Sequence, residues 1–156
     1  MSRSYSHKRR NRIFSPSTKC IVLSKLVNCI MLKGKKLIAI KLLKKALDYI
    51  QYEIGVNPVR TLYEAVDNIT PHVEVRTMKV GGVSYQIPID VSSSRRLGLA
   101  LRWLVSASRQ RREANMWAKL AWEIIESALR RSASYKKKES VHALAKANQA
   151  FAHMGW

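Results

Sequence analysis

Residues 73–91, which read VEVRTMKVGGVSYQIPIDV, constrain the fold more than any other segment of the chain. Apolar and polar residues alternate on both sides of Gly81-Gly82, which indicates two β-strands joined by a tight turn. Most apolar residues of the two halves have odd numbers, namely Val73, Val75, Val83, Tyr85, Ile87, Ile89 and Val91, so placing these on one face requires an odd-length loop or a β-bulge. Pro88 removes a hydrogen-bond donor from the ladder, which suits a two-stranded ribbon with free edges. The segment therefore predicts a single long β-hairpin.

The rest of the chain has the apolar periodicity of helices, interrupted by residues that typically begin or end them. Six helices are expected: from Ser15-Pro16 to about Gly34, 36–53, 58–70, from the serines at 92–94 to about 112, from Asn115 onward, and about 138–152. The fold class is thus mainly α, a bundle of about six helices with one protruding β-hairpin at about 73–91. We expect residues 1–14 to form a basic, flexible arm and residues 15–156 to form a single helical domain.

The chain is strongly basic. Its 156 residues include 29 Lys and Arg against 10 Asp and Glu, which gives a formal net charge of +19. Because such a surplus destabilises a compact state by self-repulsion, we expect a polyanionic partner, either nucleic acid or an anionic membrane surface. No run of about 18 apolar residues occurs, so no membrane-spanning helix is expected.

The basic residues are unevenly placed along the chain. Residues 1–47 contain thirteen Lys and Arg and no acid, whereas residues 48–75 contain five acids and a single base. Residues 76–156 are basic again. A bound polyanion is therefore expected to contact only part of the surface, and the third helix, with Glu64 and Asp67, is expected to face away from it.

The first twelve residues, MSRSYSHKRRNR, are rich in Arg and Ser and contain no acid, as in a mitochondrial presequence. They lack the amphipathic spacing of such a signal, because almost no apolar residue precedes Ile13. We favour a disordered basic arm over a cleaved presequence.

No catalytic or metal-binding constellation is evident. Cys20 and Cys29 lack the spacing of a zinc site and are expected to be small buried hydrophobes. Glu123 and Glu126 are interpreted as ordinary solvated helix surface rather than as an acid/base pair. No ligand or triad spacing relates the four histidines, which are His7, His72, His142 and His153. We therefore expect no enzyme activity, no cofactor, no metal and no small-molecule substrate.

Basic clusters are the better candidates for a site. In the fourth helix Arg95, Arg102 and Arg109 recur every seven residues and so share one helical stripe, with Arg96 and Arg112 beside it. Only one acid lies close to them in sequence. This imbalance favours contact with a polyanion, and a solvated basic face is the alternative.

Two lysine clusters stand between helices. Lys33, Lys35 and Lys36 surround a glycine, where a turn of backbone and three cations can meet a phosphate. Lys136, Lys137 and Lys138 come at the expected start of the sixth helix, and a lysine run in such a place is usually a mobile loop. Three tryptophans at helical core spacing are expected in the core rather than as base-stacking platforms: Trp103, Trp117 and Trp122.

Four segments carry a family resemblance: KLVNCIMLKGKK at 25–36, AVDNITPHVEVRTMKVGGVSYQIPIDV at 65–91, LALRWLVSASRQR at 99–111, and KKKESVHALAKANQAFAHMGW at 136–156. Together they resemble the universal small-subunit ribosomal protein seven family, over about residues 22 to 156. The specific hallmarks are VGG.SYQ.P in the hairpin, ALRW in the following helix and H.LA.AN.AFAH near the end.

The resemblance implies a helical bundle with a protruding hairpin that binds the 3′ major domain of small-subunit rRNA and nucleates assembly of the subunit head. It also implies a place near the exit-site tRNA and the mRNA path, with head and platform proteins as neighbours and no membrane partner. Positions that match the family's RNA contacts are Lys35, Lys36, Arg76, Lys79 and Arg102. Where the family usually has a basic residue this chain has Met78, so hairpin contacts with RNA are expected to be weaker.

Residues from the basic clusters, the arm and the family match make up the expected RNA-binding set, with Gly81 and Gly82 at the hairpin tip. The set is Arg3, Lys8, Arg9, Arg10, Arg12, Lys33, Lys35, Lys36, Arg76, Lys79, Arg95, Arg96, Arg102, Arg109, Arg112, Lys136 and Lys137.

The resemblance also bears on the compartment. Bacterial members often extend past the Ala-His-aromatic segment, whereas this sequence stops at Trp156, which resembles organellar members. We therefore expect a ribosome in an organelle, mitochondrion before plastid, with the bacterial cytoplasm as the alternative. The alternative function is an independent architectural nucleic-acid-binding protein whose β-ribbon arm enters a groove.

Overall fold

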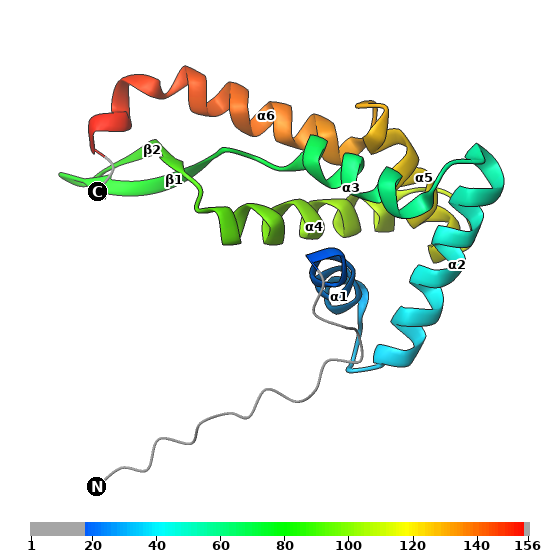
Figure 1. Ribbon diagram of the computed structural model, residues 1–156. Helices are drawn as coiled ribbons and strands as arrows, with labels where there is room; N and C mark the ends of the chain where they lie inside the picture. Colours follow the sequence, from blue (N-terminus) through cyan, green and yellow to red (C-terminus); the bar gives the residue numbers. More distant parts are fainter. Residues whose placement is uncertain (1–17, 155–156) are drawn as a thin grey trace, which may run out of the picture.

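The computed structural model describes residues 18–154, which form six α-helices, one two-stranded antiparallel sheet and a short 3₁₀-helix (Figure 1). The elements are α1 (Thr18–Ile30), α2 (Lys36–Ile54), α3 (Pro58–Ile69), β1 (Val73–Val80), β2 (Val83–Asp90), α4 (Ser93–Gln110), α5 (Met116–Ala128), α6 (Ala133–Ala147) and η1 (Gln149–Met154). This arrangement confirms the mainly helical fold class with one hairpin. Among residues 18–154, no helix has both the length and the apolar character needed to span a bilayer.

Helix α5 is central, because it packs against α2, α3, α4 and α6. Its Leu120 and Ile124 are fully buried, and they share one core with Leu62 of α3 and Leu101 of α4. The three tryptophans pack against the edge of this core, as expected; they are Trp103, Trp117 and Trp122. The apolar stripes of the helices thus find their partners mainly on α5.

The turn between α2 and α3 is built as the sequence predicts. Gly55 has a φ of 70° and its N–H donates to the carbonyl of Gln51, which ends α2. The side chain of Asn57 accepts the N–H of Val59 at 3.0 Å, and Pro58 occupies the first helical turn of α3. The two helices are therefore joined by a short, hydrogen-bonded turn.

One expectation about the bounds of the helices was wrong. The sixth helix begins at Ala133 rather than near residue 138, because the hydroxyl of Ser132 accepts the N–H of Tyr135 and caps the helix earlier. The following lysines therefore lie in the first turns of α6 and not in a loop.

The hairpin has the register of a two-residue turn, which corrects the expected odd-length loop or bulge. Val73 lies opposite Asp90, and Val80 lies opposite Val83. The two residues between the strands, both glycines, have φ of 59° and 86°, in agreement with a type I′ turn. The apolar residues of the two strands consequently lie on opposite faces of the ribbon.

The expected register was wrong because both faces of the ribbon's base are covered. Val75 of β1 is half-buried on one face, and Ile87 of β2 is fully buried on the other. Helix α6 packs on β1 and η1 packs on β2, where the ring of Tyr85 lies 5.3 Å from that of Phe151. The base of the hairpin is therefore held by the C-terminal elements, and its tip extends beyond the helices (Figure 1).

Candidate nucleic-acid interface

The arginine stripe of α4 connects the hairpin with α1. Near the start of α4, Arg95 lies 3.0 Å from Glu74 of β1. Near its end, Arg109 donates to the carbonyls of Cys29 and Ile30 at the end of α1. Arg102, between them, is exposed and donates to the carbonyl of Gly98 in its own helix. Helix α4 thus carries a row of three arginines, two helical turns apart, from the hairpin base to the α1–α2 junction.

Glu74 binds two of the expected RNA-contacting arginines. Its carboxylate lies 2.7 Å from Arg76 of the same strand as well as 3.0 Å from Arg95. Partial burial raises the pKa of Glu74, but hydrogen bonds from Arg95 and Arg76 outweigh this effect, and the pKa lies below its ordinary value. The sequence did not predict that Glu74 pairs with Arg95, because the two residues are 21 positions apart and meet only in the folded protein.

The α1–α2 junction presents three exposed lysines, Lys33, Lys35 and Lys36. Lys33 and Gly34 have φ of 50° and 74°, so the chain turns sharply between the helices. Two of the lysines and Arg109 border a groove of about 560 Å³ between α1, α2 and the start of α5, with an apolar floor. Because Arg109 contacts the last carbonyls of α1, this lysine cluster and the α4 stripe form one connected basic surface.

The lysines of α6 also approach α4. The ammonium of Lys137 lies 5.7 Å from the centre of the Trp103 ring, and Lys136 and Lys137 are both exposed. Lys138, by contrast, is half-buried and donates to the backbone carbonyl of Asn68 at 2.7 Å. The first two remain candidate RNA contacts, while Lys138 serves the packing of α6 on α3.

The remaining residues of the expected RNA-binding set differ in their exposure to solvent. Arg112, beyond the end of α4, is exposed, as is Lys79 near the tip of the hairpin. Arg96 is half-buried and donates to the carbonyl of Val91 at 2.7 Å, so it stabilises the start of α4. The arm residues lie outside the described part of the chain; they are Arg3, Lys8, Arg9, Arg10 and Arg12.

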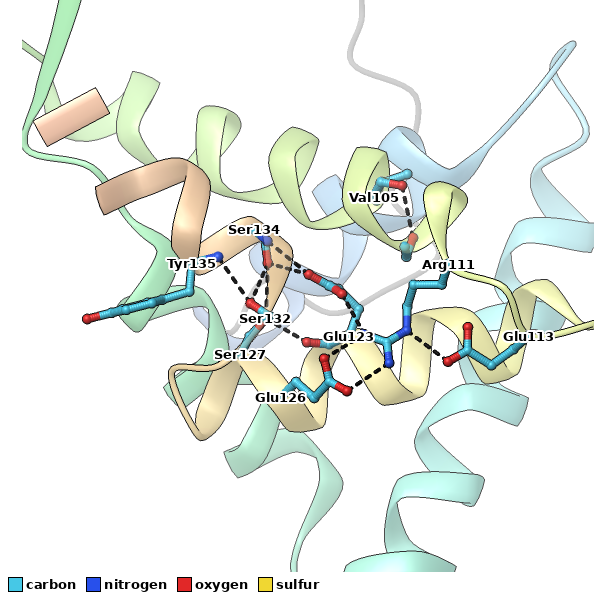
Figure 2. A network of polar contacts seen from close by, with 10 residues as sticks. Val105, Arg111, Glu113, Glu123, Glu126, Ser127, Ser132, Ser134 and Tyr135 are labelled. Carbon is cyan, nitrogen blue, oxygen red and sulfur yellow. Dashed lines mark hydrogen bonds and ion pairs between the residues drawn. The ribbon is translucent and has the colours of Figure 1, made fainter. Parts of the chain in front are cut away.

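The sequence did not predict the network around Arg111, which Figure 2 shows. Arg111 lies between three carboxylates: Glu113 at 3.0 Å, Glu123 at 2.9 Å and Glu126 at 2.7 Å. The hydrogen bonds that Arg111 donates to Glu126 first, and then to Glu123 and Glu113, outweigh its partial burial, so they raise the pKa of Arg111 and keep its charge fixed. The sequence did contain a signal for this network, because three acids follow Arg111 within fifteen residues in an otherwise basic half of the chain.

This network corrects the interpretation of Glu123 and Glu126 as solvated surface. Glu123 is fully buried, and its other carboxylate oxygen accepts the N–H and the hydroxyl of Ser134 at 3.1 and 2.7 Å. The network therefore joins the end of α4 to α5 and α5 to the first turn of α6. Among residues 18–154, no three His, Cys, Asp or Glu side chains are placed to hold a metal.

Comparison with known proteins identifies the family of this chain. Residues 2–149 match the family model described as ribosomal protein S7p/S5e. The chain belongs to this family. It is therefore a ribosomal protein, with a structural rather than an enzymatic role.

The similar proteins include bacterial members named small ribosomal subunit protein uS7. The Bartonella henselae protein is 43% identical over 152 residues, which cover 96% of this chain and 97% of that protein. The Mesorhizobium japonicum protein is 41% identical over 156 residues, which cover all of both chains. The family resemblance seen in the sequence is thus confirmed over nearly the whole chain.

Proposed function

We propose that this protein is a structural constituent of the small ribosomal subunit that binds the 3′ major domain of its rRNA and nucleates assembly of the head. The observation that carries the proposal is the connected basic surface along α4, which joins the hairpin base and the α1–α2 junction. Lys137 of α6 approaches α4 at Trp103. Membership of the ribosomal protein S7p/S5e family supports it.

In this proposal the cations of the connected surface neutralise rRNA phosphates. Double-stranded RNA is read mainly through its shape, its phosphates and its 2′-hydroxyls, which suits an array of Arg and Lys on rigid helices. Lys35 and Lys36 at the α1–α2 junction, Arg102 on α4 and Arg76 on β1 take the central positions. The N-terminal arm folds onto RNA as it binds.

The hairpin has a second role in the proposal. Its base is fixed by α6 and η1, so the two-stranded ribbon reaches farther from the helices than a loop of the same length would. We place its tip near the exit-site tRNA and the mRNA path, beside head and platform proteins. Lys79 is exposed near this tip, whereas Met78 is half-buried and adds no charge.

The proposal also covers the compartment in which this ribosome works. The relatives described above are bacterial, and the alignment spans 97–100% of their length, so length does not distinguish an organellar from a bacterial protein. We propose an organellar ribosome, mitochondrion before plastid, on the divergence of the chain from these relatives. Fractionation of the source cells tests this, because recovery of the chain in cytoplasmic ribosomes alone would contradict it.

A salt titration of RNA binding tests the proposed interface. If about ten phosphates are contacted, the logarithm of the affinity for the 3′ major domain RNA should fall linearly with the logarithm of salt concentration, by about 0.7 to 0.9 per phosphate. Removing residues 1–12 should weaken binding and flatten the slope. The double variant Lys35→Ala and Lys36→Ala should lower the slope by about two.

The matched control is Arg60→Ala on α3, in the acidic segment, which should leave the slope unchanged. A slope that none of the basic variants alters would contradict the interface. An independent architectural protein is distinguished by sedimentation, because it would follow DNA rather than small ribosomal subunits.

A further inference from the structure

Three large apolar side chains are exposed within five residues of sequence around the end of α2. Tyr52 is 85% exposed, Ile54 is 40% exposed and Val56 is 46% exposed. A single exposed apolar residue is common on protein surfaces, but an aromatic residue grouped with aliphatic neighbours is typical of the centre of an interface. We call these three residues the turn patch, because they surround the turn between α2 and α3.

The backbone holds the turn patch in one conformation. Gly55 donates to Gln51 at 2.9 Å, and the side chain of Asn57 accepts the N–H of Val59 at 3.0 Å. A partner that binds here does not have to order a flexible loop first. A preorganised surface of this kind loses little conformational entropy on binding.

The charges around the turn patch are mainly negative, although the chain as a whole carries +19. Asp48 lies four residues before Tyr52 and so shares its helical face, and exposed Glu53 is its neighbour. Exposed Glu64 of α3 pairs with Arg60 at 2.9 Å, so the one base of this segment is already engaged. Lys44 and Lys45, the last lysines of α2, lie one turn before Asp48, so only the final turns of the helix lack a base.

The turn patch lies away from the proposed RNA interface. Figure 1 shows the α2–α3 turn at the end of the molecule opposite the hairpin. Carboxylates repel phosphate, so an RNA backbone is a poor occupant of this surface. A cationic polypeptide is complementary to it, because its Lys and Arg can reach the carboxylates while their methylene stems and any apolar neighbours cover Tyr52, Ile54 and Val56.

We propose that the turn patch docks a Lys- and Arg-rich segment of a neighbouring protein in the ribosomal particle. The exposed ring of Tyr52 receives an arginine or lysine by a cation–π contact, and Asp48 and Glu53 pair with further cations. This inference rests on the proposed function, since it requires the chain to be inside the subunit.

Site-specific photocrosslinking in purified small subunits tests the proposal. The chain is produced with p-benzoylphenylalanine in place of Tyr52, incorporated into subunits and irradiated, and the linked peptide is identified by mass spectrometry. We expect a cross-link to a protein segment in which Lys and Arg exceed Asp and Glu. Charge reversal by Asp48→Lys and Glu53→Lys should lower the yield about tenfold without loss of incorporation.

The matched control is Glu139→Lys, which reverses the charge of an exposed acid on α6 and should not lower the yield. A cross-link to rRNA alone, a cross-link to a segment without excess positive charge, or no cross-link in subunits that contain the chain would overturn the inference and leave the proposed function standing. Absence of the unmodified chain from small subunits would instead overturn the proposed function, and the inference with it.

Discussion

The guanidinium of Arg111 binds the carboxylate of Glu126 through two parallel hydrogen bonds, from Nη1 to Oε2 at 2.7 Å and from Nη2 to Oε1 at 2.8 Å. Such bidentate pairs fix geometry as well as charge. Arg111 also contacts the buried carboxylate of Glu123, which binds Ser134 of α6, so the end of α4 is linked through α5 to the start of α6. Helix α6 in turn packs on the hairpin.

Arg111→Ala is expected to destabilise the protein by about 3 kcal/mol, because removing one partner leaves the fully buried Glu123 without its counter-ion. Chemical denaturation followed by circular dichroism measures the free energy of unfolding. The control is Arg112→Ala, which removes an exposed neighbour and should cost less than about 0.5 kcal/mol. Equal losses in the two variants would show that the network does not support the fold.

Ser132→Ala is expected to cost about 1 to 2 kcal/mol, because it removes the N-cap of α6 and a buried hydroxyl that hydrogen-bonds Ser127 and Ser134. Hydrogen exchange should be faster in the first turn of α6 than in the parent protein. The matched variant is Ser140→Ala, at an exposed position within α6, where little change is expected. Unchanged exchange at Tyr135 after loss of the cap would contradict the prediction.

Replacing Gly81 and Gly82 with valine should affect function more than folding. Both glycines have positive φ, which a β-branched residue adopts only with strain, whereas a two-stranded ribbon adds little to global stability. We expect the melting temperature of the isolated protein to fall by less than about 4 °C, while translation or assembly of subunits that carry the variant is impaired.

Gly98→Ala is the control for the hairpin variant. Gly98 lies within α4, and a Cβ placed there has only Arg102 near it, at 3.9 Å, so this change should be tolerated in both measurements. A double-valine protein that lost its helical core while its subunits translated normally would refute the assignment of the hairpin tip to function.

His142 should make the stability of the protein depend on pH near neutrality. Its Nε2 accepts the backbone N–H of His72. Burial first, and then the charges of Lys138 and His72, lower the pKa of His142 below its ordinary value of 6.5. The unfolded chain therefore binds a proton before the folded protein does, so stability is full above pH 6.5 and is lost as the pH falls below 6.5 towards the folded pKa.

Denaturation at pH 7.5 and 5.5 checks this, with His142→Gln as the comparison, because glutamine keeps an acceptor but does not titrate. The parent should lose more free energy of unfolding over this interval than the variant. Glu74 and Glu126 do not interfere, since their pKa values lie below 4.5 and their contributions are lost only at lower pH. An equal pH dependence of parent and variant would sink the prediction.

Local signals in the sequence determined the elements of this fold and most of their ends. Alternation on both sides of two glycines predicted the hairpin, and Gly55, Asn57 and Pro58 predicted the turn between α2 and α3. These signals are reliable here because a positive φ, a side-chain cap and a missing N–H each act within a few residues. The motifs in the hairpin, in α4 and near the C-terminus were enough to identify the family.

Only the tertiary structure decided which charges are available and which faces are covered. Glu74 meets Arg95 across 21 residues, and Glu123 is buried only because α6 places Ser134 over it. The hairpin register followed from the cover on both faces of its base, which alternation along one strand does not encode. Local periodicity shows that a residue has an apolar or a polar side chain, but its burial and its ionic partners depend on elements that are distant in sequence and meet only when the core around α5 forms.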